Sequence, residues 1–168
     1  MSGKGILLLG RFLYRYRGVI AVPFFIMLVV LSKPSPRAVL PYLFLVTGMA
    51  VRVWAVGYIG SPSRKNIFLG TYVIANGPYR IIKNPLYVGN FLLVIGVILL
   101  FSPPVWFAAV IIITFLIEYS IIVMSEQNYL THLPRRKAQF NLDNLKSEIS
   151  TFLVIIAIYI IYVIRLKV

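Results

Sequence analysis

GPYRIIKNPLYVGN, residues 77–90, is the polar stretch around which the rest of the chain is arranged, because it lies between two long apolar runs. Its glycines and prolines interrupt helices and let the backbone approach a ligand. Its tyrosine, lysine, arginine and asparagine side chains supply phenols, cations and amides. Two interpretations follow from this composition. The stretch is either a turn whose cations fix the topology of a membrane protein or a ligand site at the membrane boundary.

The composition of the chain is that of a membrane protein. Of its 168 residues, 60% are hydrophobic, whereas soluble domains contain roughly 45–50% apolar residues. Lys and Arg outnumber Asp and Glu by 17 to 4. These cations lie in short loops beside apolar runs, so anionic lipid headgroups explain them better than nucleic acid does. We expect one integral membrane domain, residues 1–168, that does not bind nucleic acid.

Several kinds of site are excluded or disfavoured by residues that the chain lacks. It contains no cysteine, which excludes disulfides, thiolate metal sites and a cysteine nucleophile. His132 is its one histidine and its four acidic residues are scattered, so we expect no metal site. The first residues lack the short apolar core and small-residue cleavage site of a signal peptide, and we expect the chain to stay intact.

Five apolar segments predict an all-α, polytopic bundle that is embedded in a membrane. The last of them has 16 residues and either spans the membrane or lies at its interface. The basic segment 1–17 before the first span forms an amphipathic helix, which either lies at the lipid headgroups or only carries flanking charges. The expected spans are 18–31, 38–60, 87–101, 105–124 and 149–164.

The third and fourth spans are joined by Ser102, Pro103 and Pro104. So short a turn requires adjacent antiparallel helices, which places residues 77–90 and 125–130 on the same membrane face. Four Lys or Arg residues occur in each of the segments 1–17, 61–86 and 125–147, two occur in 32–37, and none occurs in the hairpin turn. The positive-inside rule therefore predicts that the N-terminus and the polar loops are cytosolic.

Two ionisable residues, Arg52 and Glu118, lie within apolar spans. Arg52 is eight residues before Gly60 and Glu118 is eight residues before Glu126, which is about 12 Å of helix in each case, so the two could pair across the bundle. The pair is either structural, or it lines a polar pocket where a lipid headgroup meets its reagent. Glu126 follows Glu118 by eight residues on the same helix face and ends the hairpin beside Lys83 and Asn84.

At this point the sequence resembles the isoprenylcysteine carboxyl methyltransferase and phospholipid methyltransferase superfamily of integral membrane enzymes. Its signature is GPYxxxRHPxYxG before a helical hairpin that ends in EExxL. Residues 52–55, RVWA, are similar to the superfamily's Arg-x-Trp-Ala. Lysine and asparagine replace the Arg-His pair, glutamine replaces the second glutamate, and the later Phe-Gly-x-x-Tyr is absent. The matching residues are Gly77, Pro78, Tyr79, Lys83, Asn84, Pro85, Tyr87, Gly89, Glu126, Gln127 and Leu130.

The resemblance implies S-adenosylmethionine as the cofactor, bound on the cytosolic side, and a membrane lipid or lipid-like acceptor with a carboxylate or an amine. It implies that Asn84 and Glu126 are catalytic. The polar pocket proposed from the position of Arg52 and Glu118 within apolar spans would then be the substrate pocket. A sulfonium cation favours carboxylates and aromatic faces, which agrees with this assignment. The expected cofactor-binding residues are Gly77, Pro78, Tyr79, Lys83, Asn84, Pro85, Tyr87, Gly89, Glu126 and Gln127.

Two other functions stay open at this stage. Membrane sterol reductases share the architecture and use NADPH at a similar cytosolic hairpin site. A scaffold without enzymatic activity, whose basic loops only bind anionic headgroups, would tolerate substitution of Asn84, Tyr87 and Glu126.

Overall fold

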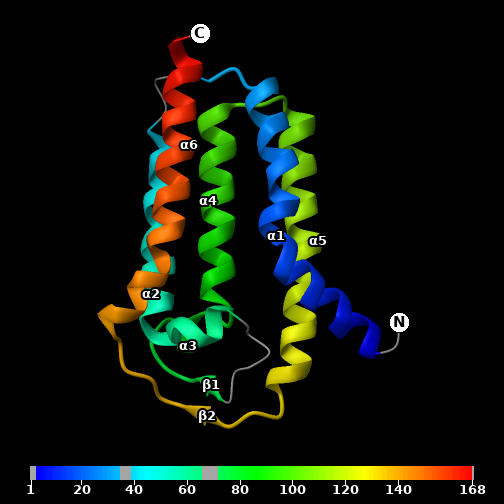
Figure 1. The fold of residues 1–168 in the computed structure, drawn as a ribbon, viewed down its shortest axis with the longest axis vertical. Helices are drawn as coiled ribbons and strands as arrows, with labels where there is room; N and C mark the ends of the chain where they lie inside the picture. Colours follow the sequence, from blue (N-terminus) through cyan, green and yellow to red (C-terminus); the bar gives the residue numbers. More distant parts are fainter. Residues whose placement is uncertain (1–2, 35–38, 66–71, 168) are drawn as a thin grey trace.

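The computed structural model describes residues 3–34, 39–65 and 72–167. Its long helices stand side by side along one axis (Figure 1). In chain order the elements are α1 (Gly3–Leu31), α2 (Leu40–Lys65), β1 (Val73–Ile74), α3 (Pro78–Ile81), α4 (Pro85–Phe101), α5 (Val105–Leu130), β2 (Arg135–Arg136), the 3-10 helix η2 (Leu142–Glu148) and α6 (Ile149–Lys167).

The five long helices confirm the predicted all-α membrane bundle. Within the described ranges, four helical segments are long and apolar enough to cross a membrane, and α4 is a shorter apolar helix. The boundaries differ from the expected spans by several residues at the polar ends, where hydrogen-bonded helix continues beyond the apolar run. The four long segments are Gly5–Leu31, Leu40–Ile59, Val105–Gln127 and Leu142–Lys167.

The first helix is longer than the apolar run from which it was predicted. Residues 3–17 do not form a separate element but continue without a break into the apolar part of α1. The first turns of α1 project away from the bundle, as Figure 1 shows. The last helix, α6, stands upright beside α2 and does not lie across the end of the bundle (Figure 1).

The predicted helical hairpin is confirmed. Ser102 ends α4 in the left-handed conformation with φ 46°, and α5 begins three residues later. The two helices are antiparallel, so the start of α4 and the end of α5 lie at the same end of the bundle as α3 (Figure 1). This end carries the sequence motif and is called the motif end below.

Helices α1 and α5 pack along an antiparallel seam with a clear register. A side chain added at Gly10 would collide with Ser125, and Leu13 packs in one cluster with Ile122 three residues further along. Seven residues beyond Gly10, this register brings Arg17 level with Glu118. The electrostatic effect of Arg17 on Glu118 agrees with that placement.

Buried apolar residues of the bundle form two clusters. The larger one surrounds Phe101 and Tyr162 near the hairpin turn, and the smaller one surrounds Tyr87 and Ile122 at the motif end. Below the smaller cluster, β1 and β2 form a parallel pair in which Val73 is opposite Arg135. This pair joins the segment before the motif to the segment after α5, a connection that the helical pattern did not predict.

Candidate active site

The motif residues lie where α2, α3, α4 and α5 meet at the motif end. Both α3 and α4 begin with proline, at Pro78 and Pro85, a residue whose fixed φ suits the first turn of a helix. The two short connections place Tyr79 and Tyr87 on successive elements. The hydroxyl of Tyr79 donates to the backbone carbonyl of Ala55 in α2 at 3.4 Å, which links α3 to the helix that carries Arg52.

The centre of the site is a hydrogen bond between Tyr87 and Glu126. The phenol of Tyr87 donates to Glu126 Oε2 at 2.9 Å, and both side chains are buried. Because these residues come from α4 and α5, the hairpin itself brings them together. A buried carboxylate that is partnered by a neutral phenol favours a nearby cation, and among the residues that the structure describes no Lys or Arg forms an ion pair with Glu126.

Tyr79 completes an aromatic and acidic group with Tyr87 and Glu126. Burial raises the pKa of the Tyr79 phenol above its ordinary value, and the negative charge of Glu126 raises that pKa further. The phenol therefore remains protonated near neutral pH and serves as a hydrogen-bond donor. Tyr79 on α3 is therefore close enough to feel the charge of Glu126 on α5, while its hydroxyl is bonded to α2.

The backbone conformation at Gly77 favours glycine. It precedes α3 with φ 60°, a conformation that L side chains rarely adopt. A Cβ atom at this position would lie 2.6 Å from the ring of Tyr58. Glycine at this position therefore allows both the positive φ and the close packing against Tyr58.

Other predicted residues do not converge on the Tyr87–Glu126 pair. Lys83 and Gln127 are exposed. Asn84 precedes α4, and its backbone carbonyl accepts from the N–H groups of Tyr87 and Val88 at 3.1 and 3.3 Å, whereas its side chain does not cap the helix. The motif therefore contains a buried part and an exposed part.

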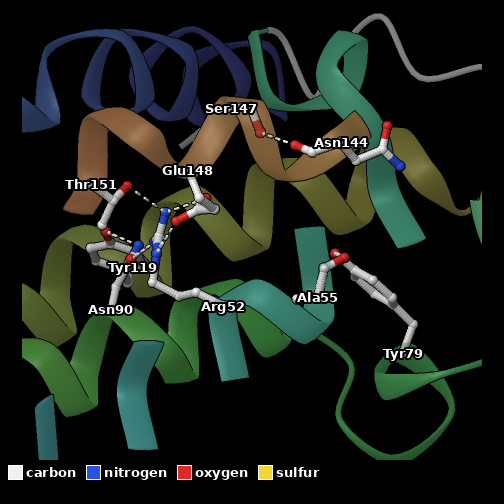
Figure 2. A network of polar contacts seen from close by, with 9 residues as sticks. All are labelled: Arg52, Ala55, Tyr79, Asn90, Tyr119, Asn144, Ser147, Glu148 and Thr151. Atoms are coloured by element: carbon white, nitrogen blue, oxygen red, sulfur yellow. Dashed lines mark hydrogen bonds and ion pairs between the residues drawn. The ribbon is translucent and has the colours of Figure 1, made fainter. Parts of the chain in front are cut away.

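The predicted pairing of Arg52 with Glu118 is wrong. Arg52 forms a bidentate ion pair with Glu148, with Nε to Oε2 at 3.0 Å and Nη2 to Oε1 at 2.9 Å. Its Nη2 also donates to Thr151 Oγ1 at 3.2 Å, and its Nη1 donates to Asn90 Oδ1. Figure 2 shows the guanidinium enclosed by these partners. Equal depth in the membrane did not determine which helix each side chain faces.

Glu118 lies in the seam between α1 and α5. Among the described residues, no hydrogen-bond donor reaches its buried Oε1 atom. The charge of Arg17, on α1, acts on Glu118. Arg52 and Glu118 therefore belong to two different polar contacts, and the structure does not join them in one ion pair.

The sequence interpretation missed three residues that connect Arg52 to the site. Asn90 donates through Nδ2 to the hydroxyl of Tyr119 at 2.8 Å. The ring of Tyr119 meets the ring of Tyr87 edge to face, with 5.0 Å between centroids. Glu148 entered no sequence argument, although its position directly before the last apolar run was a usable signal. Asn90 directly follows Gly89, and Tyr119 directly follows Glu118, so each adjoins a predicted residue.

The residues at the motif end fit an adenosyl sulfonium cofactor. The donor set offers a buried carboxylate at Glu126 and aromatic groups at Tyr79 and Tyr87, which suit a sulfonium cation. The exposed cations Arg80 and Lys83 suit the carboxylate of the cofactor. Within the described residues, no three His, Cys, Asp or Glu side chains gather as a metal ion would require.

Comparison with known proteins gives one family. A model of the phospholipid methyltransferase family matches residues 36–133, more than half of the chain. The matched region contains the motif, the hairpin and Arg52, and it ends before β2. No curated protein and no solved structure matches the chain.

Proposed function

Because the chain belongs to the phospholipid methyltransferase family, we propose that it transfers the methyl group of S-adenosylmethionine to a lipid or lipid-like acceptor. The Tyr87–Glu126 pair carries this proposal, since the hairpin places a carboxylate in an apolar, aromatic setting next to the motif. Such a setting favours a cation that brings its own charge into a dry site. The apolar bundle around it suits an acceptor that arrives from the bilayer.

Each residue of the motif end has a place in this proposal. Glu126 faces the sulfonium, and Tyr87 holds the carboxylate in orientation. Asn84 is half-buried and directly precedes α4, and we assign its amide the role of binding the cofactor and aligning it for transfer. When bound, S-adenosylmethionine supplies an already activated methyl group. The protein therefore contributes alignment and exclusion of water more than acid or base strength. The remaining predicted cofactor contacts are Gly77, Pro78, Tyr79, Lys83, Pro85, Gly89 and Gln127.

The charges near the site favour an amine acceptor over a carboxylate acceptor. Arg52 is already matched by Glu148 in a bidentate ion pair and has little attraction left for an anionic headgroup. Glu118 keeps a buried carboxylate oxygen without a hydrogen bond among the described residues. A headgroup that carries an amine would supply the missing donor. We therefore place Glu118 in the substrate pocket and assign Arg52 a supporting position beside it.

Ligand-dependent thermal stability tests the cofactor. The detergent-solubilised protein is heated with S-adenosylmethionine, S-adenosylhomocysteine, NADPH or no addition. A ligand at 100 times its dissociation constant stabilises a folded protein by about 2.7 kcal/mol. Both adenosyl compounds are expected to raise the melting temperature of the wild type. In Glu126→Gln the rise with S-adenosylmethionine should be lost, whereas the rise with S-adenosylhomocysteine, which lacks the sulfonium charge, should change less.

Asp143→Asn is the matched control for this experiment. Asp143 is exposed and pairs only with solvent-facing Lys146 among the described residues, so the response of this variant should equal that of the wild type. A rise with NADPH alone would support a reductase instead. If S-adenosylmethionine raised the melting temperatures of the wild type and Glu126→Gln equally, Glu126 would not belong to the cofactor site.

A further inference from the structure

The surroundings of Arg52 include residues beyond the family match, which ends at residue 133. Glu148 lies at the end of η2 and Thr151 in the first turn of α6. We propose that this C-terminal segment completes the site, and that Glu148 is a positioning residue that acts through Arg52, Asn90 and Tyr119 on the Tyr87–Glu126 pair. The inference rests on the proposed function, because it concerns the same site.

The first step of the argument is the burial of the ion pair. Glu148 is 0% exposed and Arg52 is 7% exposed, so neither charge is screened by water. The fork of the guanidinium meets both carboxylate oxygens, at 2.9 and 3.0 Å. A bidentate contact of this kind fixes orientation as well as distance. Glu148 therefore determines how the plane of the guanidinium is turned.

The second step follows from donor and acceptor chemistry. Arginine can only donate, so the remaining guanidinium nitrogen must face the oxygen of the Asn90 amide. The amide nitrogen of Asn90 is then directed to the hydroxyl of Tyr119, which accepts at 2.8 Å. Figure 2 shows Asn90 and Tyr119 side by side next to the guanidinium. The orientation of the asparagine amide is thus set by Arg52.

The third step connects Tyr119 to the carboxylate of the site. Its ring is stacked on Phe115, with 4.0 Å between centroids, and its edge-to-face contact with Tyr87 is at 5.0 Å. Tyr87 in turn donates to Glu126 at 2.9 Å. A series of direct contacts therefore runs from the C-terminal segment to Glu126. Through these contacts, a change at Glu148 would alter the placement of Tyr87.

Glu148 is not needed to hold the segment against the bundle. The backbone N–H of Asn141 and the side chain of Asn144 both donate to the carbonyl of Gly57 at 2.9 Å. The ring of Phe140 packs against Tyr58, with 5.8 Å between centroids. These contacts dock η2 on α2 without any charge from Glu148. A variant of Glu148 should therefore keep the segment in place while changing the orientation of Arg52.

The test compares Glu148→Gln with the double variant Arg52→Met/Glu148→Met. Glu148→Gln leaves a buried arginine without its counter-charge, which destabilises a protein, whereas removal of both charges is often tolerated. The double variant is expected to melt within about 3 °C of the wild type. Asp143→Asn, an exposed acid of the same 3-10 helix, is the matched control and should behave as the wild type.

The readout is the ratio of the dissociation constants for S-adenosylhomocysteine and S-adenosylmethionine. The two compounds differ in the sulfonium charge, so the ratio reports on the carboxylate that faces it. We expect this ratio, which measures the preference for S-adenosylmethionine, to fall by about tenfold in Glu148→Gln and in the double variant. A loss of this size is typical of one misplaced charged hydrogen bond. The effects of Glu148→Gln and Tyr119→Phe should not add, because both act through the same contacts.

Recovery of both the melting temperature and the ratio in the double variant would overturn the inference, since Glu148 would then only stabilise the fold. An unchanged ratio in Glu148→Gln would also overturn it and would leave the proposed function intact. A wild type that binds neither compound would contradict the proposed function itself, and the inference would fall with it.

Discussion

At the scale of single residues, the site depends on which side chains the helices leave room for. Gly89 follows Tyr87 by two residues in α4 and lies against Arg52 of α2. A Cβ atom at Gly89 would be 2.5 Å from Cγ of Arg52. The absence of a side chain here lets the arginine pass between the helices and reach Glu148. A glycine of the motif thus has a packing role that its sequence pattern alone does not reveal.

Gly89→Ala tests this role. Overpacking of a tight contact typically costs 1–3 kcal/mol, so we expect a lower melting temperature and a weaker affinity for S-adenosylmethionine. Gly18→Ala is the matched control, because a Cβ atom there has no neighbour within 4 Å. Alanine should stabilise the helix at that position by about 0.5–1 kcal/mol. Equal melting temperatures in the two variants would contradict the close contact between Gly89 and Arg52.

Sequence reasoning identified Arg52 and Glu118 as unusual but gave them the wrong partners. The number of residues to the end of a span gives the depth of a side chain, and it says little about the direction in which that side chain points. The direction depends on the register between helices, which places Glu118 against α1 and Arg52 against α6. The pairing of Tyr87 with Glu126 was within reach of the sequence because a three-residue turn fixes how α4 meets α5.

At the scale of elements, the pairing of β1 with β2 closes the motif end. Val73 and Ile74 are opposite Arg135 and Arg136, and the side chain of Asn76 makes two hydrogen bonds with the backbone of Ala138, at 2.7 and 2.8 Å. Strands of two residues have no detectable alternation of polar and apolar side chains. This part of the fold therefore could not be predicted from periodicity, although it holds together the two segments that flank the site.

A disulfide cross-link tests this pairing. The chain contains no cysteine, so Val73→Cys/Arg135→Cys introduces the one possible pair. Facing residues of neighbouring strands have the Cα separation that a disulfide needs. We expect rapid cross-linking under mild oxidation, measured by mobility on a denaturing gel. Val73→Cys/Gln139→Cys, which is out of register, should cross-link more slowly, and equal rates in the two variants would argue against the parallel pair.

At the scale of the whole molecule, the hydropathy pattern predicted the bundle and the hairpin, because a membrane requires helices of fixed minimum length. The expected ends of the helices were less accurate. Helical backbone hydrogen bonding extends beyond the apolar runs. As a result α1 begins at Gly3, before the expected span 18–31, and α5 ends at Leu130, after the expected span 105–124. The upright position of α6 is accompanied by contacts with α2, such as the hydrogen bond between Arg52 and Thr151 and the ring contact between Tyr42 and Tyr159. A hydropathy profile carries no information on such contacts.

The excess of cations in the segments at the motif end predicts that this end faces the cytosol. Single cysteines at Lys83 and Val105 test the orientation, since both side chains are exposed and they lie at opposite ends of α4 and α5 (Figure 1). A membrane-impermeant maleimide added to intact cells should label Val105→Cys and leave Lys83→Cys unlabelled until the cells are permeabilised. Labelling of Lys83→Cys in intact cells would reverse the proposed topology.

The central claim is methyl transfer at the Tyr87–Glu126 pair, and the most direct measurement follows the methyl group itself. The purified protein is placed in vesicles of total membrane lipid with methyl-labelled S-adenosylmethionine, and the label in the extracted lipid is counted over time. We expect label to accumulate with the wild type and with Asp143→Asn, and to fall by about a hundredfold with Glu126→Gln, as after loss of a preorganised charge at a reacting centre. Lipid that remains unlabelled although the protein binds S-adenosylmethionine, or equal labelling by Glu126→Gln, would contradict the account.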